Sequence, residues 1–110
     1  MILKNHTHKT ILAHDLKEAK TLKEKSVGLL SAAKPYALLF HTRWGIHTFG
    51  MKYPIDVLVL NKHNYVVKLK EKLKPNQIFL WNPMYHCIIE LPTQTIHHSK
   101  TSQGDLVKWK

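Results

Sequence analysis

The sequence has a single cysteine, a single arginine and no apolar run long enough to cross a bilayer. Cys87 alone cannot form an intramolecular disulfide, so the composition favours a reducing, cytoplasmic location. A membrane-spanning helix needs about 20 mostly apolar residues, and no segment supplies them. Residues 1–10 show no apolar core followed by a small-residue cleavage site, so an export signal is not expected.

Acidic residues are also scarce, at 7 against 17 basic residues, which gives a net charge of +10. This balance favours contact with nucleic acid, an anionic membrane or an acidic ligand. Arg43 is the only arginine, however, although arginine is the side chain that contacts phosphate or guanine bidentately. The lysines are scattered along the sequence, so a solvated lysine-rich surface is the leading interpretation. We expect six lysines to be exposed on more than one face: Lys17, Lys25, Lys62, Lys68, Lys70 and Lys72.

What the chain does contain is 44% hydrophobic residues within 110, enough for one folded domain spanning residues 1–110. Short apolar runs with period-two alternation dominate. The predicted strands are residues 8–14, 36–41, 55–60, 65–70, 78–81, 86–91 and 106–109. Residues 55–60 and 65–70 are separated by four turn-forming residues and should form an antiparallel hairpin. The pattern predicts a mainly β fold, borderline α+β, arranged as a jelly-roll-like sandwich or a partly closed barrel.

One helix is expected near the N-terminus. Asp15 followed by Glu18 has the spacing of a capping box, and apolar residues then recur at helical spacing. Gly28 and Pro35 place the end of this amphipathic helix between Val27 and Ala33.

Asp56 interrupts the apolar segment 55–60 and needs a polar partner if it is buried. We favour a structural role in which its carboxylate accepts amide hydrogen bonds from the turn 49–54. The alternative is a pocket that Asp56 lines together with His47 and Glu90. Such a His/carboxylate group could bind a divalent metal or perform acid–base chemistry. No residue spacing matches a zinc or metalloprotease signature, so neither a metal site nor a cofactor is predicted.

Other reactive or exposed side chains are few. Cys87 is expected to be a buried, inert thiol, because the neighbouring His86 points to the opposite face of its strand. Trp44, Phe49, Met51, Tyr53 and Trp81 are expected to form core and rim. Any of these that remain exposed together would mark a recognition surface.

Several segments resemble the domain of unknown function 192 family over about residues 10–110. These are residues 28–30 (GLL), 47–51 (HTFGM) leading into 54–57 (PIDV), 66–67 (VV), Pro75, 90–92 (ELP) and 104–105 (GD). The resemblance implies a mainly β sandwich with jelly-roll character and one packed helix, and no established activity. Family members usually continue after the Glu-Leu-Pro segment with alanine and glycine, where this chain has Thr93 and Gln94. A glycine there would allow positive φ, so Gln94 suggests a loop that is differently shaped or less constrained.

The expected function is that of a non-catalytic binding or accessory module of unknown partner. One alternative is a small metal- or carboxylate-dependent enzyme, a hydrolase or lyase, that uses His47, Asp56 and Glu90. A second alternative is a basic nucleic-acid-binding protein. Catalytic residues are unknown, and the candidate ligand-binding residues are His47, Met51, Asp56 and Glu90.

Overall fold

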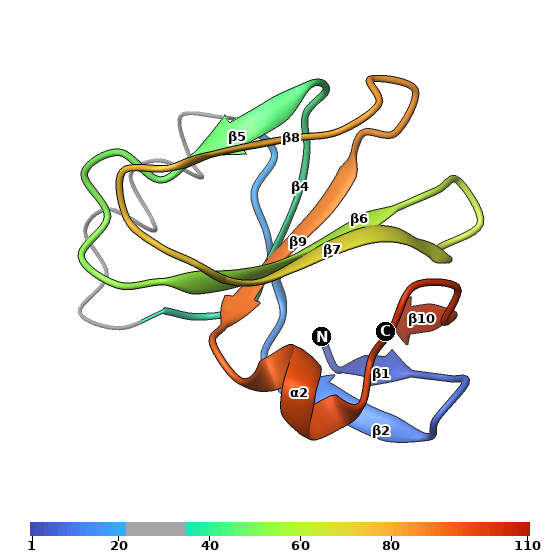
Figure 1. Ribbon diagram of the computed structural model, residues 1–110. Helices are drawn as coiled ribbons and strands as arrows, with labels where there is room; N and C mark the ends of the chain where they lie inside the picture. Colours follow the sequence, from blue (N-terminus) through green and yellow to red (C-terminus); the bar gives the residue numbers. More distant parts are fainter. Residues whose placement is uncertain (22–34) are drawn as a thin grey trace.

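The computed structural model describes residues 1–21 and 35–110, which form ten strands and one short helix (Figure 1). The elements are β1 (Leu3–Asn5), β2 (Thr10–Ala13), β3 (Lys17–Glu18), β4 (Leu38–His41), β5 (Gly45–His47), β6 (Ile55–Leu60), β7 (Val66–Leu73), β8 (Ile78–Leu80), β9 (Cys87–Pro92), α2 (Thr95–Ser99) and β10 (Val107–Trp109). The mainly β prediction is confirmed, and each predicted strand overlaps an observed one. Within the described residues no helix is long and apolar enough to cross a membrane.

The strands form three sheets, none of which closes into a barrel. A five-stranded sheet has the order β3-β4-β9-β6-β7, a three-stranded sheet the order β10-β1-β2, and β5 pairs with β8 alone. All pairs are antiparallel except β3 with β4. Figure 1 shows the β5·β8 ribbon at one end of the molecule and the three-stranded sheet at the other, with the five-stranded sheet between them.

Within the five-stranded sheet β6 is buried on both faces, which explains its nearly unbroken apolar sequence. Ile55, Val57 and Val59 enter a core that includes side chains of β5 and β8. Leu58 and Leu60 enter a second core built with β1, β2, β10 and α2. Two opposing layers therefore cover this one sheet.

The predicted hairpin is confirmed, because β6 and β7 pair antiparallel across residues 61–65. The Asn61 side chain accepts hydrogen bonds from the amides of His63 and Tyr65 at 2.9 and 3.0 Å. Asn64 takes a left-handed conformation with φ 70°. Asparagine suits both tasks, which is why the turn could be recognised in the sequence.

The predicted helix start at Asp15 is wrong. Lys17 and Glu18 form β3, which pairs parallel with β4. The amides of Lys17 and Ala19 donate to the carbonyl oxygens of Ala37 and Leu39 at 3.1 and 2.9 Å, so they are not available for helical bonds. Long-range pairing thus overrides the local capping signal, and an N-terminal helix is not supported. Residues 22–33 of that prediction lie outside the described residues.

The helix found in the described residues, α2, was not predicted. It has five residues and is preceded by Gln94, whose φ of 74° is left-handed. This is a backbone conformation that glycine adopts without strain. The loop after β9 therefore has a glycine-type turn although the residue is glutamine.

Candidate functional site

Asp56 is 1% exposed, which confirms its predicted burial, but its hydrogen-bond donors differ from those expected. Its two carboxylate oxygens accept the amides of Lys72 (2.9 Å) and Ile96 (3.0 Å) from β7 and α2. The expected donors in turn 49–54 lie elsewhere, because Met51 of that turn packs in the core on the other face of the sheet. Burial raises the pKa of the Asp56 carboxyl, as does Glu71, while the amide hydrogen bonds oppose this rise.

Glu90 is equally buried, but it faces away from Asp56. In the register of β6 with β9, Glu90 pairs with Val57 and Asp56 pairs with Leu91. Paired residues share a face of a sheet, so the two carboxylates lie on opposite faces. Glu90 lies near two tyrosines: burial raises the pKa of Tyr36 and Tyr53, and the Glu90 charge adds to both shifts.

The other two candidates lie around the β5·β8 ribbon. His47 is exposed on β5, and its ring stacks on Phe49 with centroids 5.0 Å apart. Met51 is 8% exposed and belongs to the core beneath the ribbon. The structure therefore does not bring His47, Asp56 and Glu90 into one constellation. Among residues 1–21 and 35–110, no group of three His, Cys, Asp or Glu side chains could hold a metal ion.

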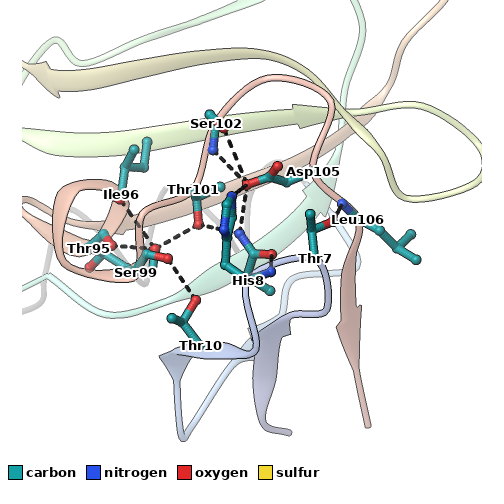
Figure 2. A network of polar contacts seen from close by, with 11 residues as sticks. Thr7, His8, Thr10, Thr95, Ile96, Ser99, Thr101, Ser102, Asp105 and Leu106 are labelled. Atoms are coloured by element: carbon teal, nitrogen blue, oxygen red, sulfur yellow. Dashed lines mark hydrogen bonds and ion pairs between the residues drawn. The ribbon is translucent and has the colours of Figure 1, made fainter.

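A polar network that sequence reasoning missed joins the three-stranded sheet to α2 (Figure 2). The buried Asn5 side chain donates to the Thr101 hydroxyl and to the Asp105 carboxylate, each at 3.0 Å. Asp105 also accepts the Ser102 amide at 2.9 Å and lies 3.2 Å from His8 Nε2. Burial alone would raise the pKa of Asp105, but these hydrogen bonds and His8 together lower it below its ordinary value.

The same network contains a serine, a histidine and an aspartate, but not in a catalytic arrangement. The Ser99 hydroxyl lies 2.7 Å from the Thr95 carbonyl and 2.7 Å from the Thr101 hydroxyl. A nucleophilic serine needs a hydrogen bond to the histidine, whereas here the His8 ring contacts Asp105 and the Ser99 hydroxyl contacts Thr95 and Thr101. The Asn5 side chain connects Asp105 to Thr101, and the Thr101 hydroxyl contacts Ser99 of α2 (Figure 2), so the network fastens the chain ends to α2. Of this network, only residues 104–105 stood out in the sequence, through the family resemblance.

Cys87 is not an activated nucleophile. Burial, with a smaller contribution from Glu18, raises the pKa of its thiol to about 11. Such a thiol carries almost no thiolate at neutral pH. The sequence predicted a buried, inert thiol; Cys87 is half-buried rather than fully buried, and its raised pKa agrees with the low reactivity.

The outer face of the β5·β8 ribbon is a contiguous exposed apolar surface. In this antiparallel pair Gly45 is opposite Leu80 and His47 is opposite Ile78, while Ile46 and Phe79 face the core. Ile78 and Leu80 are 61% and 62% exposed. With the neighbouring Trp44 and Phe49 they form what we call the ribbon surface: Trp44, His47, Phe49, Ile78 and Leu80.

Two backbone features hold this surface in place. A Cβ at Gly45 would lie 2.6 Å from Leu80 Cδ2 and 2.7 Å from the Phe79 carbonyl oxygen, so only glycine fits there. Trp44 has φ 76°, and the Gly45 amide donates to the Arg43 carbonyl at 2.9 Å. This is the geometry of a classic γ-turn, which is rare and strained, and it carries a tryptophan that is 68% exposed.

The surface is more basic than the composition indicates. Three of the 7 acidic residues, Asp56, Glu90 and Asp105, are buried. The predicted exposure is confirmed for Lys17, Lys62, Lys68, Lys70 and Lys72, while Lys25 lies outside the described residues. Lys68 Nζ donates to the Leu80 carbonyl at 2.7 Å and lies 4.9 Å from the centre of the Phe79 ring. A lysine therefore covers the outer edge of β8.

Comparison with solved structures gives two similar folds. One is a protein provisionally described as a transcription regulator from Sinorhizobium meliloti 1021, with TM-score 0.79 and 17% identity over 97% of this chain and 89% of that one. The other is a protein of unknown function from Novosphingobium aromaticivorans DSM 12444, with TM-score 0.80 and 13% identity over 98% and 82%. At these identities the likeness establishes the fold alone.

Comparison of sequences gives the family. No curated protein matches the chain significantly. The sequence model of the DUF192 family, described as "Uncharacterized ACR", matches residues 2–109. Because this match spans nearly the whole chain and agrees with the resemblance noted above, the chain belongs to the uncharacterised DUF192 family.

Proposed function

We propose that the chain is a single-domain, non-catalytic binding module that recognises an acidic segment of a partner protein through the ribbon surface. The observation that carries this proposal is the exposure of Ile78 and Leu80 on one rigid two-stranded element, together with the exposed Trp44 immediately before β5. Contiguous apolar side chains on an otherwise charged surface mark sites of interaction. The element is rigid because Ile46 and Phe79 anchor its other face in the core.

The chemistry of the ribbon surface favours a protein over a nucleic acid. Bases stack on aromatic side chains. At the centre of this surface, however, the two residues that β8 contributes are aliphatic: Ile78 is opposite His47, and Leu80 covers Gly45. A tryptophan beside a basic residue, here Trp44 after Arg43, is typical of the residues that dominate protein interfaces. We expect the partner to bind through side-chain contacts and not by adding a strand to β8, since Lys68 already donates to the Leu80 carbonyl at the outer edge of that strand.

Charge determines which protein segments fit. The chain carries a net charge of +10, and Arg43 and Lys68 border the ribbon surface. Two copies of such a chain repel one another, whereas an acidic segment is attracted. We therefore place acidic side chains of the partner near these two residues and its apolar side chains against Trp44 and Ile78. The single cysteine supports a cytoplasmic location for this module. The two cores on either face of the central sheet support a sandwich of jelly-roll character.

The experiment is a selection of random 12-residue peptides on the immobilised protein, with counter-selection against the Trp44→Ala variant. A synthetic fluorescein-labelled consensus peptide then serves as the probe in fluorescence anisotropy. We expect enriched peptides to combine acidic and apolar residues and to bind more weakly as salt rises. Trp44→Ala and Ile78→Ser should each raise the Kd about tenfold or more, as for residues that dominate an interface.

The matched control is Ile11→Ser, which removes another exposed isoleucine at the opposite end of the molecule. It should leave the Kd unchanged. Selection of no peptide, or equal losses in Ile11→Ser and Ile78→Ser, would overturn the proposal. Sedimentation equilibrium tests whether the ribbon surface binds a second copy of the chain instead. A dimer that the Trp44→Ala substitution dissociates would show that it does.

A further inference from the structure

The outer face of the three-stranded sheet gathers lysines from the two ends of the chain. The register of β1 with β10 places Lys4 directly opposite Lys108. Ile2 and Lys110 exchange both backbone hydrogen bonds, at 3.0 and 3.3 Å, one step further along the same face. Side chains two residues apart on a strand share a face, so Lys108 and Lys110 lie about 7 Å apart on it.

This arrangement is unfavourable for the isolated fold. The Ile2–Lys110 pair is hydrogen-bonded, so the alternation of the ladder makes Lys4–Lys108 a hydrogen-bonded pair with Cα atoms about 5.5 Å apart. Like charges directly opposite one another in a sheet are destabilising. Within the described part of the chain none of the lysines on this face is in an ion pair with a carboxylate.

The face is also concave. Two shallow cavities of about 370 and 420 Å³ adjoin at Lys4 and Lys108. The first is lined further by His6, Lys9 and Thr10, and the second by Lys110. Among residues 1–21 and 35–110, no acidic side chain lines either cavity. Donors of one charge sign therefore surround space that is open to solvent.

We propose that this face, which we call the lysine face (Lys4, His6, Lys9, Lys108 and Lys110), binds the phosphodiester backbone of a nucleic acid duplex. The phosphates of one strand follow one another with a rise of about 3.4 Å along the duplex axis, so two cations about 7 Å apart along that axis span two such steps. Lysine contacts phosphate as a point charge, and arginine is not needed for contacts that do not read bases. The inference concerns a different face from the ribbon surface and does not rest on the function proposed for it.

A duplex fits this face better than a membrane surface does. Membrane-binding surfaces insert large apolar or aromatic side chains. The apolar members here, Ile2 and Ile11, are 40% and 49% exposed, less than Ile78 and Leu80 of the ribbon surface, and Trp109, which lines the second cavity, is half-buried. The large exposed apolar side chains Trp44 and Leu80 lie instead at the other end of the molecule.

The test is fluorescence anisotropy of two labelled 20-base-pair DNA duplexes of unrelated sequence, titrated from 50 to 200 mM NaCl. Both duplexes should bind equally. Four lysines that each neutralise one phosphate give a slope of log K against log salt near −3.6, a loss of about 150-fold over this range. The double variant Lys4→Gln/Lys108→Gln should halve the slope, which leaves a loss of about 12-fold. The control Lys62→Gln/Lys70→Gln makes the same charge change on the β6·β7 hairpin and should keep the wild-type slope.

A second variant separates binding from folding. Lys108→Glu places an opposite charge across from Lys4, so it should raise the melting temperature while it weakens duplex binding. A slope that is unchanged in Lys4→Gln/Lys108→Gln, or reduced equally in the control, overturns the proposal. Binding to vesicles of equal parts phosphatidylglycerol and phosphatidylcholine is measured as well. Binding to them that depends on Lys4 and Lys108, without duplex binding, would assign the face to a lipid surface instead.

Discussion

Asp56 and Glu90 lie on neighbouring strands of the five-stranded sheet with their carboxylates on opposite faces, because Val57 rather than Asp56 is the register partner of Glu90. A carboxylate pair on two faces of one sheet cannot act on one substrate atom. His47, which is exposed on the separate β5·β8 ribbon, does not bridge them. Asp56 instead holds α2 and β7 in place through its two amide hydrogen bonds. The three residues are not arranged as the alternative of an enzyme that uses His47, Asp56 and Glu90 together would require.

Asp56→Asn should lower the free energy of unfolding by about 1–3 kcal/mol. Each carboxylate oxygen now accepts one backbone amide, and an asparagine would turn an N–H₂ donor toward one of these donors. Guanidinium unfolding measures the change. Asp15→Asn is the matched control, because it makes the same change at an exposed aspartate and should leave the stability nearly unchanged. Unchanged stability together with the loss of a magnesium-dependent rise in melting temperature would instead make Asp56 a ligand.

Asp105 should make the protein sensitive to acid. Its folded-state pKa lies below its ordinary value, since hydrogen bonds from Asn5 and Ser102 and the nearby His8 outweigh the effect of burial. The ionised form therefore contributes stability that is full above the unfolded-state pKa of about 3.9 and is lost as the pH falls through the folded-state pKa. Wild-type protein should lose more unfolding free energy between about pH 6 and pH 3 than Asp105→Asn does. Parallel curves for the two proteins would contradict this assignment.

Gln94→Gly should stabilise the protein by up to about 1 kcal/mol. Gln94 holds φ 74°, and glycine removes the steric cost of that conformation, although it also adds entropy to the unfolded chain. Thr93→Gly is the control, because residue 93 has no positive φ and should only lose stability. Thermal melts of the two variants therefore shift in opposite directions. A destabilised Gln94→Gly would mean that the glutamine side chain makes a contact worth more than the strain.

Cys87 should react slowly with Ellman's reagent. Its thiol pKa of about 11 leaves about 0.1% thiolate at pH 8, against about a quarter for an ordinary cysteine. The greater nucleophilicity of a basic thiolate recovers part of this difference, so we expect a rate at least about tenfold below that of glutathione. The rate should rise in urea as the strand opens. Reaction at the glutathione rate in native buffer would contradict the buried environment.

Local signals in the sequence correctly predicted the elements whose contacts are made between residues close together in the chain. The β6·β7 hairpin follows from apolar alternation and from Asn61 and Asn64, whose side chains and φ angles make the turn by themselves. The capping signal at Asp15 was equally local, and it failed because the amides of Lys17 and Ala19 find partners in Ala37 and Leu39, about 20 residues away. The short strands β1, β3 and β5 were not predicted, because each contains too few residues to show a period-two alternation.

The candidate sites depended still more on long-range pairing. The alternation around Asp56 and Glu90 correctly gave the face that each occupies within its own strand, but only the register between β6 and β9 relates the two faces. The lysine face unites residues about 100 positions apart, so no window of sequence contains it. Trp44 and Phe49 were singled out as residues that would mark a recognition surface if exposed, and the structure exposes both.

The most direct test of the central proposal is to locate the bound peptide by nuclear magnetic resonance. The ¹⁵N-labelled protein would be titrated with the selected acidic peptide, and shifts in the amide and tryptophan indole signals would be mapped onto the structure. Recognition through the ribbon surface predicts that the largest shifts fall at the Trp44 indole and in residues 45–49 and 78–80, while β1, β2 and β10 stay unchanged. Shifts concentrated on β1, β2 and β10, with an unaffected Trp44 indole, would contradict it.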